Sequence, residues 1–182
     1  NNSIEIYNED ALSLPIWKLG SGSREVIANL PYNISTKILI NLLKNSSQFS
    51  KLTMMFQKEV ANRIIAKPGS KPYSRLSVIT QLKTKTKILF DIPDTAFFPK
   101  PKVQSSLVQF IPYENEKHNF DFEKMEELTR FVFSKKRKML RTIFKKEGGS
   151  SFLNSINVDP NIRPENLTLE EFCKLEFYLR KY

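Results

Sequence analysis

The chain has 182 residues, of which 40% are hydrophobic, so its composition indicates a folded core and argues against disorder. Lysine and arginine total 29 against 19 acidic residues, and the net charge of +10 favours a polyanionic partner, either nucleic acid or an anionic membrane surface. A basic surface that serves only solubility would explain the same composition. One cysteine, Cys173, and one histidine, His118, exclude an internal disulfide and a zinc cluster, and no metal site is expected.

Membrane association is the weaker reading of this charge. No apolar run approaches the length of a membrane span, and no signal peptide is visible. Nucleic acid is therefore the predicted partner, and a reducing cytoplasmic location is expected. Cys173 falls in a helical pattern near the end of the chain and is predicted to be a small core residue.

The first part of the chain alternates short apolar runs with helical patterns. Strands are predicted at residues 4–7, 26–28, 52–56, 85–90 and 103–111. Helices are predicted at residues 35–43 and 57–66, the first because its apolar residues recur at helical spacing. This alternation predicts an α/β sheet covered by helices.

From about residue 113 the pattern becomes helical. Residues 113–119 are polar and form the predicted linker, so we divide the chain into domains at 1–112 and 113–182. Helices are predicted at residues 122–133 and 138–146. Thr168 and Glu171 have the spacing of a capping box, which predicts another helix directly after Thr168.

Positive charge is concentrated in residues 130–146, which hold eight basic residues and no acidic one. Solvated helix faces usually mix both signs, so this segment is a candidate phosphate-binding surface, although a basic face without a partner is the alternative. The apolar residues predicted to pack inside the helical part are Leu128, Phe131, Val132, Met139, Leu140, Ile143 and Phe144. The cations expected to stay mostly free and to contact RNA phosphates are Lys135, Lys136, Arg137 and Arg141.

Asn29, Leu30, Pro31 and Tyr32 form the sharpest local signal. They lie between a predicted strand and a predicted helix, where open α/β sheets bind ligands. The Asn29 side-chain oxygen and the Leu30 carbonyl can accept hydrogen bonds from an exocyclic amine and orient its lone pair toward a methyl donor, so no strong base is needed. Pro31 stiffens the turn, and Tyr32 offers an aromatic face to an unstacked base. A plain turn after a strand is the alternative.

Two further segments carry candidate site residues. Asp10 and Ala11 follow the first predicted strand, where a carboxylate can accept a hydrogen bond from the amine of a cofactor adenine; a solvated acid is the alternative. In the proline-rich loop after residue 96, Phe97 can present a second stacking surface, while Lys100 and Lys102 can reach phosphates. The alternative is a crossover loop with Phe97 in the core.

These three segments, in this order and spacing, resemble the ribosomal RNA adenine dimethyltransferase family. Sequences similar to its housekeeping small-subunit branch are QKEVANRIIAKPGS at residues 57–70, YSRLSV at 73–78, KRKMLR at 136–141 and RPENL at 163–167. The resemblance covers essentially the whole chain. It implies a Rossmann-like class I methyltransferase sheet followed by a small, all-helical, RNA-binding C-terminal domain.

The resemblance also implies an activity. The family uses S-adenosylmethionine to dimethylate the N6 amines of two adjacent adenines near the 3′ end of small-subunit ribosomal RNA. The implied partner is that RNA or the pre-ribosomal small subunit, and a monomer is expected. The implied cofactor site comprises Asp10, Ala11 and Asn29. The implied target site comprises Asn29, Leu30, Pro31, Tyr32 and Phe97, with Phe97 stacked on the flipped adenine.

The chain departs from the family pattern at its start. The family opens with a strand and a glycine-rich cofactor loop, followed by a second strand ending in an acid, and the sequence lacks both. Gly20, Ser21 and Gly22 precede a strand instead of following one, so they are predicted to form a surface turn. We therefore expect a truncated protein, a sheet without its first strands, and a chain that binds cofactor weakly and is inactive alone.

Two alternatives to the small-subunit methyltransferase stay open. One is a basic fragment that binds ribosomal RNA without catalysis, which the missing glycine loop favours. The other is a macrolide-resistance type of methylase that acts on large-subunit RNA, against which the housekeeping-like segments argue.

Overall fold

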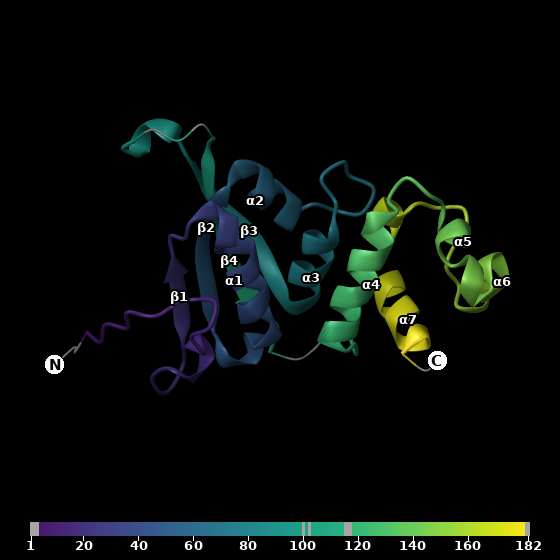
Figure 1. Ribbon diagram of the computed structural model, residues 1–182, viewed down its shortest axis with the longest axis horizontal. Helices are drawn as coiled ribbons and strands as arrows, with labels where there is room; N and C mark the ends of the chain where they lie inside the picture. The colour runs from purple at the N-terminus through teal and green to yellow at the C-terminus, as the bar shows by residue number, and fades with distance from the viewer. Residues whose placement is uncertain (1–3, 100, 102, 115–117, 181–182) are drawn as a thin grey trace.

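The computed structural model describes residues 4–99, 101, 103–114 and 118–180. This part of the chain contains a four-stranded sheet with the order β1-β2-β4-β3. Its strands are β1 (Glu25–Ala28), β2 (Lys51–Gln57), β3 (Thr84–Ile92) and β4 (Ser105–Pro112). β1 runs parallel to β2, whereas β4 is antiparallel to both β2 and β3 (Figure 1).

Three helices pack against this sheet: α1 (Tyr32–Lys44), α2 (Lys58–Ile64) and α3 (Arg75–Lys83). The apolar stripe that predicted α1 is buried, as are alternate residues of β2 and β4, and all belong to one apolar cluster. The helix residues are Ile38, Leu39, Leu42 and Leu43, and the strand residues are Leu52, Met54, Phe56, Val108 and Phe110. The buried face of α1, which has helical spacing, thus packs with the buried face of β2, which has strand alternation.

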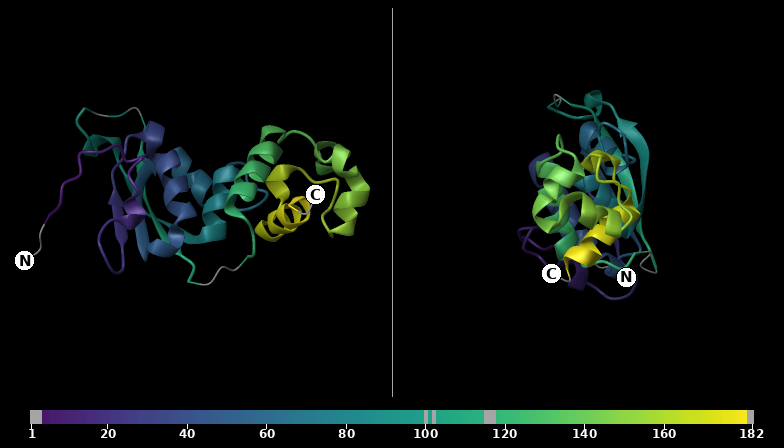
Figure 2. Two further views of the ribbon diagram at one scale, coloured as in Figure 1. Left: turned by 60° about the horizontal axis from the view of Figure 1, so that its bottom comes forward. Right: turned by 90° about the vertical axis from the view of Figure 1, so that its right-hand side faces the viewer.

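The described elements after the sheet are helical and lie at the other end of an elongated molecule (Figure 2). They are α4 (Phe122–Ser134), α5 (Leu140–Ile143), α6 (Gly149–Ser155) and α7 (Leu169–Leu179), with short 3₁₀ turns at Lys145–Glu147 and Pro164–Asn166. α4 packs on α3, and the two helices contribute to the same apolar cluster. An ion pair between Arg75 and Glu126 also joins them. The domain boundary at residue 112 stays a prediction.

Most predicted elements are confirmed, with ends shifted by up to a few residues. The strands at 26–28, 52–56, 85–90 and 103–111 correspond to β1–β4. The capping box is present at the start of α7, where Thr168 and Glu171 bond reciprocally. Cys173 packs against the core, and burial raises the pKa of its thiol to about 12.

Two predicted elements are wrong. Residues 4–7 are not a strand: Ile4 and Ile6 are 87% and 88% exposed, and this segment runs out from the body of the molecule (Figure 1). An apolar alternation forms a strand only when a neighbouring strand satisfies its backbone groups, and no described strand pairs with this segment.

The helix predicted at residues 138–146 is interrupted. Met139 has an extended backbone, and the amides of Leu140 and Arg141 donate to the carbonyls of Ile162 and Pro160 at 2.9 Å each. These long-range bonds replace the helical bonds that the amides would otherwise make, so α5 begins only at Leu140.

Two helices, α3 and α6, were not predicted. The buried face of α3 includes Ser77 and Thr80, which are fully buried, so apolar periodicity does not reveal this helix. Thr80 Oγ1 donates to the Leu76 carbonyl at 2.7 Å, which satisfies the hydroxyl inside the core.

Candidate functional site

The turn between β1 and α1 has the strand–turn–helix setting that the sequence predicts. β1 ends at Ala28 and α1 begins at Tyr32, with Pro31 at the N-cap position. The Pro31 carbonyl accepts hydrogen bonds from the amides of Ile34 and Ser35, both at 3.1 Å. Asn29 is exposed at the carboxyl end of the strand, so its amide is available to a ligand.

This turn lines a cavity of about 380 Å³ together with the loop that follows β3. The described lining residues are Asn29, Leu30, Pro31, Tyr32, Met55, Phe97, Phe98, Pro99 and Pro101. All five residues predicted to form the target site thus border one space, although Phe97 lies far from the turn in sequence. Among the described lining residues there is no carboxylate or imidazole, so the cavity is suited to orienting a neutral group.

The two predicted stacking residues are held differently. The Tyr32 hydroxyl lies 2.6 Å from Ser105 Oγ, at the start of β4. Phe97 is half-buried and does not belong to the core cluster, which argues against the alternative that it is a core residue. Phe98 also lines the cavity and is fully exposed, and sequence reasoning did not single it out although it adjoins Phe97.

A polar network connects α2 with the segment where the Phe97 loop leads into β4. Lys58 Nζ lies 2.7 Å from Asp91 Oδ2, and Ser106 Oγ donates to Asp91 Oδ1 at 2.6 Å. The hydrogen bonds from Lys58 and then Ser106 hold the pKa of the Asp91 carboxyl below its ordinary value. The Lys58 amide also donates to the Gln104 carbonyl at 2.9 Å. These contacts tie the end of the loop to β3 and to the first residue of α2.

Asp10 and Ala11 do not line this cavity. Asp10 is exposed, and its Oδ1 accepts a hydrogen bond from the Leu12 amide at 2.9 Å, which fixes the carboxylate at the start of a turn. Ala11 packs against the core. The sequence predicted Asp10 to follow a strand at residues 4–7, and the structure has no strand there. The predicted cofactor contact of Asp10 therefore lacks the strand end that was expected to position it.

The basic segment is less uniform than predicted. Lys136 and Arg137 are exposed, as expected. Lys135 is half-buried with its ammonium 3.7 Å from the centroid of the Phe131 ring, and Arg141 donates to Asn161 Oδ1 at 2.7 Å. Lys100 and Lys102 lie outside the described residues.

The apolar stripe of this segment is mostly buried. The buried members are Leu128, Val132, Leu140, Ile143 and Phe144. Phe131 and Met139 are each 38% exposed, so the prediction is wrong for Met139 and holds only in part for Phe131, whose ring contacts that of the buried Phe144. The Phe131 ring also makes a cation–π contact with the Lys135 ammonium.

A second cavity, of about 700 Å³, connects α2 with this basic segment. Its lining includes the cationic side chains of Arg63, Lys71 and Lys136. Arg63 also pairs with Glu59 one turn earlier. Sequence reasoning selected only Lys136, because Arg63 and Lys71 lie outside the basic segment.

In the described part of the chain, no helix is long and apolar enough to cross a membrane.

Comparison with known proteins gives the family. The model of the family described as ribosomal RNA adenine dimethylase matches residues 1–181. The chain belongs to this family. The ribosomal RNA small subunit methyltransferase A of Gluconobacter oxydans is 40% identical over 172 residues, which cover 94% of this chain and 57% of the relative. The Wolbachia protein of the same name, from the strain wRi, is 44% identical over 93% of this chain and 63% of the relative.

The chain thus spans about 60% of the length of these curated relatives. Among solved structures, a dimethyladenosine transferase from Plasmodium falciparum is 28% identical with a TM-score of 0.84, over 99% of this chain and 74% of the other. The 23S rRNA methyltransferase ErmE is 18% identical with a TM-score of 0.65, over 97% of this chain and 72% of the other, and shows the fold alone. The predicted α/β methyltransferase fold is confirmed.

Proposed function

We propose that the protein is a ribosomal RNA adenine N6-dimethyltransferase that acts on two adjacent adenines near the 3′ end of small-subunit RNA. The observation that carries the proposal is the cavity shared by the Asn29–Tyr32 turn and Phe97. Family membership supports the reaction, and the names of the relatives favour the small subunit over the large-subunit alternative. The substrate is ribosomal RNA or the pre-ribosomal small subunit, and the protein acts as a cytoplasmic monomer.

In this proposal, Asn29 and Leu30 bind the target amine. The Asn29 Oδ1 and the Leu30 carbonyl oxygen accept one hydrogen bond each from the N6 amine, which aims its lone pair. Tyr32 and Phe97 hold the flipped adenine between aromatic faces. Pro31 keeps the turn rigid, so the geometry exists before the base arrives. The described lining residues include no carboxylate or imidazole, which is consistent with catalysis by orientation.

S-adenosylmethionine, when bound, supplies an activated methyl group. The neutral, largely apolar lining of the cavity, with Met55 and the prolines beside Asn29, is compatible with such a donor next to a neutral amine. Asn29 borders both groups in this proposal. Asp10 accepts a hydrogen bond from the cofactor adenine, and its carboxylate is already oriented by the Leu12 amide. Ala11 lines the same part of the cofactor site.

RNA phosphates are bound by the basic segment, through Lys135, Lys136, Arg137 and Arg141, and by Lys100 and Lys102 of the loop beside the target site. The exposure of Lys136 and Arg137 supports this role. The cavity that Lys136 shares with Arg63 and Lys71 extends the basic surface toward α2. Backbone contacts of this kind position the enzyme and do not read sequence.

Replacement of Asn29 tests the proposal. In the full-length protein, Asn29→Ala should lower methyl transfer to small-subunit RNA by on the order of 100-fold or more, because the amine loses an orienting acceptor. RNA affinity should change little. The matched control is Asn41→Ala, an exposed position further along α1, which should retain activity. Unchanged turnover in Asn29→Ala would overturn the assignment. Calorimetric titration of the full-length protein with S-adenosylmethionine separates the methyltransferase from the non-catalytic RNA-binding alternative, whereas the 182-residue chain alone should bind this cofactor weakly or not at all.

A further inference from the structure

One partly buried hydrogen bond connects the turn with β4, which lies two strands away from β1 in the sheet. The Tyr32 hydroxyl and Ser105 Oγ are 2.6 Å apart, although 73 positions separate them in sequence. Ser105 is fully buried and Tyr32 half-buried, so water competes poorly for this contact. Neither residue belongs to the apolar core cluster, and the Ile34 and Ser35 amides at the start of α1 bond to the Pro31 carbonyl and not to this hydroxyl pair.

The serine side of this contact is rigid. Ser105 pairs with Gln57 of β2 on one side and with Ile92 of β3 on the other. The adjacent Ser106 is bonded to Asp91, which pairs in turn with Lys58. A strand residue held on both sides has little freedom to move, so Ser105 Oγ is a fixed point.

The tyrosine side, in contrast, is held through its side-chain rotamer. Tyr32 is the first residue of α1, and it borders the cavity together with Phe97. A tyrosine at such a position can adopt several side-chain rotamers, and only some present the face of the ring to the cavity. The bond to Ser105 selects among them.

We propose that Ser105 is a positioning residue for the target base: its hydroxyl holds the Tyr32 ring in the orientation that stacks the flipped adenine. This inference rests on the proposed function and adds to it a residue outside the Asn29–Tyr32 turn. Ser105 touches neither base nor cofactor and acts through Tyr32. Loss of the bond lets the ring leave its stacking orientation, so kcat falls while KM for S-adenosylmethionine stays unchanged.

A double-mutant cycle in the full-length protein tests this coupling. Tyr32→Phe keeps the ring and removes the hydroxyl, and Ser105→Ala removes its partner. Each should lower kcat by about 3- to 10-fold, the range that one neutral hydrogen bond supports. The double variant should be no worse than either single variant, because all three lack the same bond. Ser105→Thr retains a hydroxyl and should restore most of the activity.

Stacking is measured independently of turnover. Small-subunit RNA with 2-aminopurine at the target position should show quenched fluorescence when bound to the wild-type protein and weaker quenching with Tyr32→Phe or Ser105→Ala. The matched control is Ser106→Ala, which removes an equally buried hydroxyl bonded to Asp91. Any loss of kcat or of quenching caused by Ser106→Ala should add to the loss caused by Tyr32→Phe, because the two side chains do not share a bond.

The outcomes separate the two proposals. An active wild type with additive effects of Tyr32→Phe and Ser105→Ala, or with full activity in both variants, overturns the positioning role and leaves the methyltransferase intact. A full-length wild-type protein that neither transfers methyl groups nor quenches 2-aminopurine overturns the proposed function itself. If Ser105→Ala does not fold, Tyr32→Phe decides, since an unchanged kcat and unchanged quenching in that variant alone contradict the inference.

Discussion

Tyr32 and Phe97 border the proposed target site from segments that are distant in the chain. Because both rings are proposed to stack on one adenine, Tyr32→Ala and Phe97→Ala should each weaken binding of the flipped base by about 1–3 kcal/mol. The measurement is the affinity for RNA that carries 2-aminopurine at the target position. Phe90→Ala, at an exposed aromatic of β3 outside the cavity, is the control. An effect of Phe97→Ala no larger than that of the control would exclude Phe97 from the site.

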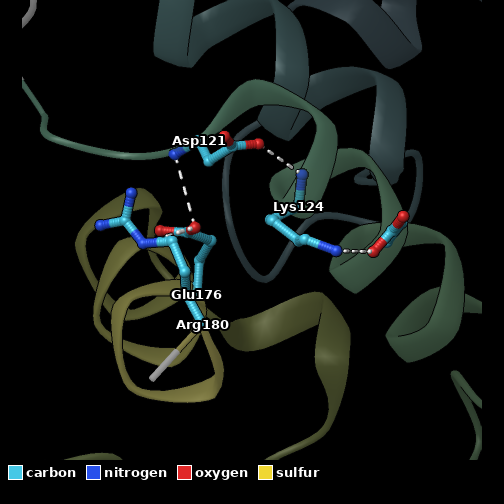
Figure 3. A network of polar contacts seen from close by, with 5 residues as sticks. Asp121, Lys124, Glu176 and Arg180 are labelled. Atoms are coloured by element: carbon cyan, nitrogen blue, oxygen red, sulfur yellow. Dashed lines mark hydrogen bonds and ion pairs between the residues drawn. The ribbon is translucent and has the colours of Figure 1, made fainter. Parts of the chain in front are cut away.

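Glu176 is a buried acid in the joint between α4 and α7 (Figure 3). It is 1% exposed, its Oε1 accepts a hydrogen bond from the Asp121 amide at 3.4 Å, and Arg180 Nε lies 3.5 Å away. Its Oε2 has no hydrogen-bond partner among the described residues. Burial raises the pKa of the carboxyl above its ordinary value of 4.5, so Glu176 releases its proton less readily in the folded state than in the unfolded state.

The raised pKa predicts how stability depends on pH. The stabilising effect of a protonated Glu176 is complete below about pH 4.5 and is lost as the pH rises through the higher pKa of the folded state. Glu176→Gln should therefore increase the free energy of unfolding at pH 7 by on the order of 1 kcal/mol, with the gain vanishing in acid. Denaturant titrations between pH 4 and 8 measure this, with the exposed Glu9→Gln as control. A gain that does not depend on pH would contradict the assignment.

At the scale of elements, α7 depends on its capping box. Thr168 Oγ1 accepts a hydrogen bond from the Glu171 amide at 3.2 Å, and Glu171 Oε2 accepts one from the Thr168 amide at 2.8 Å. Thr168→Ala should lower the free energy of unfolding by about 1 kcal/mol, because the Glu171 amide loses its hydrogen-bond acceptor. Thr168→Ser keeps the acceptor and should cost much less. Equal losses in the two variants, measured by chemical denaturation, would show that the methyl group matters more than the cap.

At the scale of the whole molecule, the prediction concerns the net charge of +10 and its location. Changing Lys135, Lys136, Arg137 and Arg141 together to Gln should weaken binding to the small ribosomal subunit. The slope of log affinity against log salt should fall by about one unit for each RNA phosphate that the variant no longer binds. Lys135 already contacts the Phe131 ring, and Arg141 already bonds to Asn161. The slope should therefore fall by less than the roughly four units expected if each of the four cations bound one phosphate.

The control for this experiment carries the same change in charge at other sites. Lys18, Lys37, Lys85 and Lys87 are exposed and lie outside the basic segment. Changing these four to Gln should leave the salt slope nearly as in the wild type. If the two quadruple variants bind alike, the basic segment is a solvated face and net charge alone attracts the RNA.

Local signals were sufficient for part of this protein. The Asn29–Tyr32 turn, the apolar period of α1 and the capping box of α7 each depend on residues within one or two turns of each other. Steric and hydrogen-bonding preferences at that range are present in the sequence itself, so these features were predicted correctly. The family resemblance rested on the same short segments.

Tertiary structure decided the rest. Residues 4–7 have the alternation of a strand but no described partner strand, and α3 is helical although Ser77 and Thr80 occupy its buried face. The shared cavity of Tyr32 and Phe97 and the bond to Ser105 likewise depend on how β4 inserts between β2 and β3. Sequence alone determined which segments could form the site, because local chemistry specifies turns and caps. Only the fold determined which of them meet, because strand pairing and burial depend on residues far apart in the chain.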